Sequence, residues 1–166
     1  RVILDEEGAP VDILRRERLE AHRLIEDFML MANEIVATRA ARRELPIPYR
    51  VHEAPGLQKL EKLREFLATL GHPLPEGALR PAALQKVLDR VRGRPEEGLV
   101  ATVILRSMSR ARYAPENLGH FGLATRNYTH FTSPIRRYPD LAVHRAVVRA
   151  FIEKGKGEGE GGLLVF

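Results

Sequence analysis

The residues best suited to chemistry lie in the run Ser133-Pro134-Ile135-Arg136-Arg137. A helix that starts at Pro134 would leave backbone N–H groups without internal partners at the positive end of the helix dipole, where anions bind. Two guanidinium groups beside that end can fork onto phosphate oxygens. The run therefore predicts a phosphate site. The alternative is a plain solvated helix end, capped by Thr132 or Ser133 with proline in its first turn.

Aromatic residues surround this basic pair. Tyr128, Phe131 and Tyr138 bracket it in the sequence, and His130 stands in the loop that leads into it. Unpaired bases stack on such rings when proteins bind single-stranded nucleic acid. The pattern favours a nucleic-acid backbone as the ligand and predicts that His130 contacts it.

Asp140 follows Arg136 by four residues and Arg137 by three. A carboxylate beside two arginines stays ionised and is a weak base, so we expect it to orient a guanidinium and not to act as a general base. His144 lies a further four residues on, and we expect it to bond Asp140 or to pack in the core.

Glu26 and Asn33 fall on one side of a predicted long helix. They predict a polar edge facing a cleft, with an apolar side on the other face that contains Ile25, Phe28 and Ala32. The alternative is that Glu26 pairs with Arg23 and that Asn33 is a surface amide.

Metal-binding patterns are absent from the sequence. There is no cysteine, and His120 and His130 stand ten residues apart without an evident third ligand. Hydrolysis of phosphodiesters by divalent metals needs several closely placed carboxylates, and the run Asp5-Glu6-Glu7 is better explained as a charged turn. We therefore predict no metal ligands in this chain.

The bulk properties fit a cytoplasmic protein that binds a polyanion. The 166 residues are 44% hydrophobic, enough for one domain or part of one, and the net charge is +5. The lack of cysteine is typical of a reducing compartment, and no apolar run is long enough to span a membrane. We expect no membrane partner.

The periodicity predicts an α+β fold that is mostly helical, with a few short strands. An N-terminal hairpin around the turn at residues 5–8 opens the chain. Helices are predicted over residues 12–43, 57–70, 81–91, 95–111 and 134–154, with a short strand or extended segment at 119–124. The glycine-rich residues 155–162 predict a flexible linker.

Several spaced blocks resemble one family. Residues 119–124 (GHFGLA) and 128–140 (YTHFTSPIRRYPD), with blocks at 24–34 and 48–55, resemble the exoribonuclease II family, and within it the bacterial ribonuclease R branch. The resemblance implies that residues 1–154 are the later part of an RNB catalytic domain, and that residues 155–166 lead toward a missing OB-type RNA-binding domain. It also implies a Mg²⁺-dependent, processive 3′-to-5′ exoribonuclease that releases nucleoside 5′-monophosphates from single-stranded RNA.

The resemblance also assigns roles to residues. It implies that Arg136 contacts the scissile phosphate and that Ser133, Arg137 and Tyr138 position the RNA backbone. The loop from Tyr128 to His130 would shape the RNA channel, and Glu26 and Asn33 would lie along the RNA path.

The metal-binding aspartates of the family belong to an upstream motif that this sequence lacks. We therefore expect the isolated chain to be inactive and to need the missing N-terminal half of the catalytic domain. One alternative is a non-catalytic module that binds single-stranded RNA, and another is a helical protein-interaction module that binds no RNA.

Overall fold

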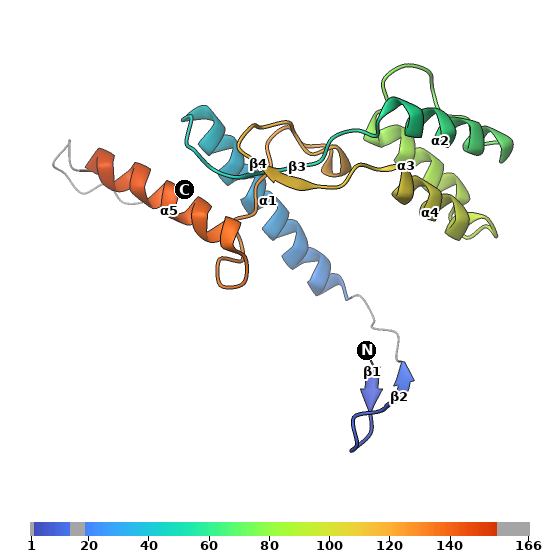
Figure 1. The fold of residues 1–166 in the computed structure, drawn as a ribbon, viewed down its shortest axis with the longest axis horizontal. Helices are drawn as coiled ribbons and strands as arrows, with labels where there is room; N and C mark the ends of the chain where they lie inside the picture. Colours follow the sequence, from blue (N-terminus) through green and yellow to red (C-terminus); the bar gives the residue numbers. More distant parts are fainter. Residues whose placement is uncertain (1, 14–18, 156–166) are drawn as a thin grey trace. The chain divides into compact units, whose positions relative to one another are not determined.

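The computed structural model describes residues 2–13 and 19–155, the side chains of 13 and 151–155 excepted. It forms two compact units, residues 1–32 and residues 33–166, which are considered separately (Figure 1). Among the described residues, no helix combines the length and the apolar character needed to cross a membrane.

The first unit contains the predicted hairpin. Strands β1 (Val2–Leu4) and β2 (Pro10–Ile13) pair antiparallel around a turn in which Asp5 accepts the N–H of Ala9 at 2.8 Å. The helix predicted from residue 12 begins instead at Glu20, as α1 (Glu20–Arg42), because Pro10–Ile13 is taken up by strand pairing. Residues 14–18 of that prediction lie outside the described residues.

The apolar side predicted for α1 is not its buried side. Ile25 and Phe28 are 58% and 54% exposed, whereas Asn33, Ala37 and Ala40 are buried. Small residues on that face let the helix backbone approach its neighbours closely, so size and not hydrophobicity selects the buried face. Asn33 lies on the side opposite Ile25 and Phe28, as its spacing predicts, and it is buried, so it is not the surface amide of the alternative.

A two-stranded ribbon packs against the buried face of α1 around Ala37 and Ala40 in the second unit. Strands β3 (Tyr49–Val51) and β4 (Arg112–Ala114) pair antiparallel, with Tyr49 opposite Ala114. The helix predicted to reach residue 111 ends earlier, as α4 (Glu97–Ser107), which leaves β4 free to pair. The ribbon packs with α1 and α5 (Tyr138–Gly155) around buried Val51 and Val143.

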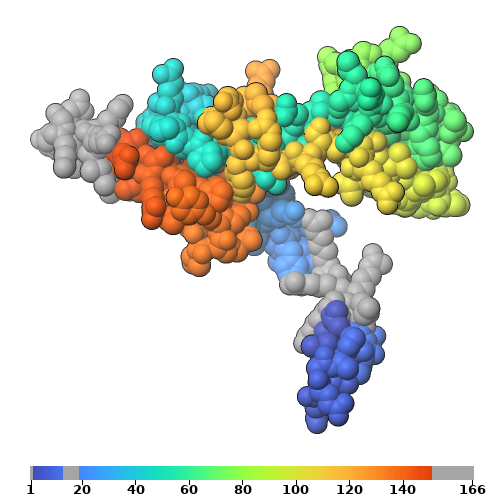
Figure 2. Space-filling model, viewed as in Figure 1, coloured from blue at the N-terminus to red at the C-terminus, as the bar shows by residue number. Residues whose placement is uncertain are grey.

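Three helices form a second core. The predicted helices over 57–70 and 81–91 are confirmed as α2 (Leu57–Thr69) and α3 (Pro81–Val91), the latter with proline in its first turn. They pack with α4 around buried apolar side chains, and Figure 2 shows their green-to-yellow atoms as one continuous body. The buried residues of this core are Leu60, Leu63, Leu67, Leu74, Leu79, Leu84, Val87, Val91, Val100 and Ile104.

Residues 119–124 do not form the short strand that was one of the two predictions for this segment. They form a short 3₁₀ turn, η1 (Phe121–Leu123), with His120 making only isolated bridges to His52 and Thr125. The backbone N–H of Gly122 donates to His52 Nδ1 at 2.9 Å. A Cβ at Gly122 would lie 2.7 Å from that nitrogen, so the turn can approach His52 only with glycine at this position.

Gly122→Ala is expected to lower the free energy of unfolding by about 1–3 kcal/mol, because η1 must move away from His52. The control is Gly98→Ala in α4, where an added Cβ meets nothing within 4 Å. That helical substitution should stabilise by about 0.5–1 kcal/mol. Urea denaturation measures both, and an equal response at the two glycines would contradict the packing described for η1.

The last helix begins at Tyr138 and not at Pro134, so the predicted helix start in front of the arginines is wrong. A helix running from residue 134 would place Pro139 in its interior, where proline has no N–H to donate and its ring clashes with the carbonyl of Ile135. Starting at Tyr138 puts Pro139 in the first turn, where it is tolerated. Residues 134–136 form a turn instead.

Candidate phosphate-binding site

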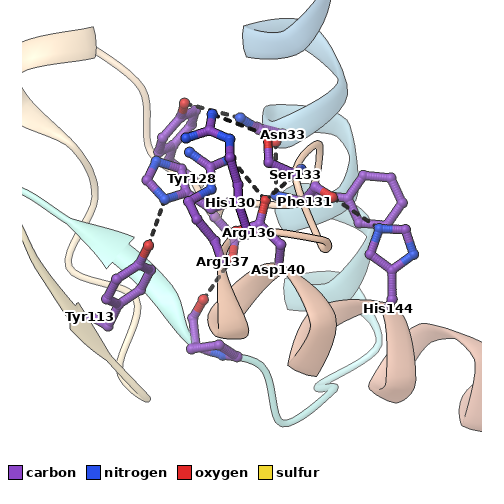
Figure 3. A network of polar contacts seen from close by, with 12 residues as sticks. Asn33, Tyr113, Tyr128, His130, Phe131, Ser133, Arg136, Arg137, Asp140 and His144 are labelled. Atoms are coloured by element: carbon purple, nitrogen blue, oxygen red, sulfur yellow. Dashed lines mark hydrogen bonds and ion pairs between the residues drawn. The ribbon is translucent and has the colours of Figure 1, made fainter.

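The turn before α5 is held from within by one buried carboxylate. The backbone N–H groups of Arg136 and Arg137 both donate to the Ser133 carbonyl, at 3.3 and 3.1 Å. Asp140 Oδ1 accepts the Ser133 N–H at 2.7 Å and the Arg137 guanidinium at 2.8 Å (Figure 3). Asp140 is completely buried. This segment is therefore not the predicted helix start, and the Asp140 carboxylate holds it in its turn conformation.

The two arginines are in different states. The side chain of Arg137 is 23% exposed and forms an ion pair with Asp140, which confirms the orienting role predicted for that carboxylate. Arg136 is exposed, and its guanidinium donates to the Ser133 hydroxyl at 3.3 Å. No carboxylate of the described residues forms an ion pair with Arg136. Arg136 is therefore the guanidinium that can turn to an incoming anion.

Asn33 holds the loop that leads into the turn. Its amide donates to the Tyr128 hydroxyl at 3.1 Å and accepts the Phe131 N–H at 2.9 Å. Figure 3 shows this side chain reaching from α1 to the loop. Asn33 and Tyr128 are 3% and 5% exposed, so both are buried supports of the loop in this structure. Direct RNA contact by either residue stays a prediction.

Only one of the three bracketing aromatic rings is well exposed. Phe131 stacks on His144, with ring centroids 4.0 Å apart and planes 6° from parallel. His144 also bonds the Phe131 carbonyl at 2.9 Å, so it packs beneath the loop and does not bond Asp140. Tyr138, at the start of α5, is 72% exposed. It is the ring of this group that is placed to meet a base.

A polar cluster beside the loop was not predicted from the sequence. The Tyr113 hydroxyl oxygen on β4 lies 2.6 Å from His130 Nδ1, and Arg50 Cζ on β3 lies 4.9 Å from the Tyr113 ring centroid. Burial and then the charge of Arg137 lower the pKa of His130, and burial raises the pKa of Tyr113. The neutral imidazole can therefore accept the Tyr113 hydroxyl. Tyr113 was missed because its contact with His130 joins residues 17 positions apart in the sequence.

His120 is the most strongly perturbed histidine of this region. Burial, followed by the charges of His52 and Arg50, lowers the pKa of His120 from 6.5 to about 4. Its Nδ1 accepts the Leu123 N–H at 3.2 Å, which the neutral ring allows. The ring also lies edge-on to Tyr128, with centroids 5.2 Å apart.

Stability is therefore expected to fall as the pH drops from about 6.5 to about 4, by roughly 1–3 kcal/mol. In this window the unfolded chain binds a proton at His120 and the folded chain does not, so stability is fully present above pH 6.5. Urea denaturation at pH 7 and pH 5 measures the change, and His120→Gln should flatten it. An unchanged pH profile in that variant would contradict a role for His120.

The remaining predicted site residue is Glu26, which belongs to the first unit. Glu26 is exposed on the part of α1 that belongs to the first unit, so its place relative to the turn is not defined. Within residues 2–13 and 19–155, no three His, Asp or Glu side chains come together as a metal site.

Comparison with known proteins relates these elements to a family. The family model described as "RNB domain" matches residues 1–153. The chain is 50% identical over 150 residues to ribonuclease R of Aquifex aeolicus, covering 90% of this chain and 21% of that protein. It is 46% identical over 167 residues to ribonuclease R 1 of Lactococcus lactis, covering 99% of this chain and 20% of that protein.

A solved structure agrees with this match. RNase R of Mycoplasma genitalium, in complex with ribose-methylated single-stranded RNA, superposes with a TM-score of 0.84 at 30% identity. The match covers 95% of this chain and 25% of that one. The chain thus spans about a fifth of the length of the curated relatives it matches.

Proposed function

This chain belongs to the RNB domain family, and we propose that it forms part of a ribonuclease R-like exoribonuclease that degrades single-stranded RNA. The proposed reaction is processive 3′-to-5′ hydrolysis with release of nucleoside 5′-monophosphates, in the cytoplasm. The relatives named ribonuclease R and the RNA-bound structural neighbour support the substrate class. Residues 1–154 would be the later part of the catalytic domain. The linker proposed at 155–166 lies almost entirely outside the described residues.

The observation that carries the proposal is the contrast between the two arginines. Asp140 neutralises Arg137 and fixes its guanidinium, whereas Arg136 is exposed and donates to a neutral hydroxyl. In phosphoryl transfer, a preorganised cation stabilises the charge that develops on the phosphate, by on the order of 3–4 kcal/mol. Arg136 would be the catalytic residue, because it can turn to the scissile phosphate without leaving a buried carboxylate unpaired.

The neighbouring residues would position the RNA. Ser133 and Arg137 hold the turn in the shape that presents Arg136, and Tyr138 offers an exposed ring to a base. Tyr128, His130 and Asn33 would keep the loop at the channel wall. Glu26 would bond ribose 2′-hydroxyls along the path, since a carboxylate repels phosphate.

Mg²⁺ enters this proposal through the family alone. The described residues do not gather into a group that could hold it. In the intact enzyme Mg²⁺ would supply an activated water and neutralise charge on the phosphate. We propose that its ligands lie in the part of the protein that this chain does not cover.

A second candidate is a non-catalytic module for single-stranded RNA. It is favoured by one observation, that Arg136 is exposed and outside any ion pair of the described residues, beside a turn that Asp140 holds. Such a module would bind RNA with strong salt dependence and would not hydrolyse it.

Product analysis separates the two candidates. The full-length protein is incubated with Mg²⁺ and with one unstructured RNA labelled at either end. We expect nucleoside 5′-monophosphates at once from the 3′-labelled RNA and only late from the 5′-labelled RNA, while the 166-residue chain alone releases none. Binding without any product from the full-length protein would favour the non-catalytic module.

A further inference from the structure

The surface of the second unit has a pocket that is separate from the Ser133–Arg137 turn. It is a pocket of about 760 Å³ within the second unit, where α3, the end of α4 and η1 meet, and no residue of that turn lines it. Lys59 of α2 stands at one side, and Arg106 and Arg110 line it near the end of α4.

The three cations of this pocket are available to a ligand. Lys59, Arg106 and Arg110 are exposed, and each lacks an ion-pair partner among the residues that the structure describes. Two other surface arginines of the same unit are in ion pairs, Arg92 with Asp89 and Arg112 with Glu53. Unpaired positive charge that gathers around a concave surface favours a polyanion.

Much of the remaining lining is apolar. Leu84 is buried, and the partly buried side chains of Leu88 and Phe121 pack against the three-helix core. Cations beside an apolar lining that includes an aromatic ring match a nucleotide, whose phosphate is charged and whose base is flat and apolar on its faces.

Hydrogen bonds hold the pocket wall together. His52 lines it and bridges two segments, since its Nε2 lies 2.7 Å from the Ser109 carbonyl and its Nδ1 accepts the Gly122 N–H at 2.9 Å. These partners require the tautomer with the proton on Nε2. These two hydrogen bonds join the chain after α4 to the η1 turn, which favours a pocket that is formed before a ligand binds.

We propose that this pocket binds a nucleotide of single-stranded RNA at a second contact, separate from the turn that carries Arg136. Phosphate groups would meet Lys59, Arg106 and Arg110, and the base would lie on Leu88 and Phe121. The proposal rests on the proposed function, since it assigns a further part of the same RNA to this surface. An acidic protein segment could pair with the cations, but its carboxylates would not stack on the Phe121 ring.

The test is fluorescence anisotropy of a labelled oligoadenylate with the full-length protein, without divalent metal, at several salt concentrations. Lys59→Glu and Arg106→Glu should each raise Kd about tenfold and reduce the slope of log Kd against log salt by about 0.7. The matched control is Lys62→Glu, an exposed lysine on the same helix that does not line the pocket, and it should leave both quantities unchanged.

Phe121→Leu tests the base contact, with a thermal melt to confirm that the variant is folded. It should weaken the oligoadenylate and leave competition by inorganic polyphosphate unchanged, and a variant that binds both as the wild type does would overturn that contact. Equal Kd values for Lys59→Glu and Lys62→Glu, in a protein that binds RNA, would overturn the pocket alone. A wild-type protein that binds no oligoadenylate would instead overturn the proposed function.

Discussion

Arg136→Ala is expected to lower the single-turnover rate of RNA hydrolysis in the full-length protein by about 10²–10³. The RNA dissociation constant should change by less than about tenfold. Arg136 is exposed and outside any ion pair in the described chain, so its loss should affect the fold little. In the proposed mechanism it acts where charge develops on the phosphate. Quenched-flow rates and anisotropy with the same RNA measure the two effects.

Two further variants test this expectation. Arg136→Lys keeps the charge but loses the forked donors, so it should recover only part of the rate. Arg149→Ala removes an exposed arginine further along α5 and should leave the rate unchanged. Equal losses of rate and affinity in Arg136→Ala would contradict the catalytic assignment and leave Arg136 as a binding residue.

Asp140→Asn is expected to destabilise the protein by about 3 kcal/mol and to weaken both RNA binding and hydrolysis. A fully buried carboxylate accepts both the Ser133 N–H and the Arg137 guanidinium. The amide keeps the shape but removes the charge, and it leaves a largely buried guanidinium without its counterion. Urea denaturation measures the stability, and the rate should fall because the turn no longer presents Arg136.

The chain offers a matched control in Asp89→Asn. Asp89 and Arg92 have the same three-residue spacing and the same 2.8 Å separation as the Asp140 pair, but their side chains are 51% and 71% exposed. The exposed pair should contribute less than about 1 kcal/mol. If Asp89→Asn and Asp140→Asn lowered the free energy of unfolding equally, burial would not be what makes Asp140 important.

Local sequence signals predicted the elements that depend on local forces. The leucine spacing and the proline at residue 81 were enough for α2 and α3, since periodicity and helix-start chemistry act within a few residues. The hairpin at Asp5 followed from its turn residues for the same reason. The family resemblance, confirmed by the RNB match, rested on short blocks whose order is preserved.

The features that were missed depend on contacts distant in sequence. Asn33 reaches Tyr128 and Phe131 across 95 and 98 residues, and His52 reaches Gly122 across 70. No periodicity within α1 reveals that a small, polar face is the one that packs. Pro139 was a local signal that was overlooked, and it moves the start of α5 past both arginines.

The central claim is that Arg136, presented by a turn that Asp140 holds, contacts the scissile phosphate of RNA. The most direct measurement is a crystal structure of the full-length protein with an RNA whose 3′-terminal phosphodiester cannot be hydrolysed. We predict the Arg136 guanidinium within about 3.2 Å of a non-bridging oxygen of that phosphodiester, with Arg137 still paired to Asp140. An Arg136 side chain directed away from the phosphate, with another residue in its place, would contradict the claim.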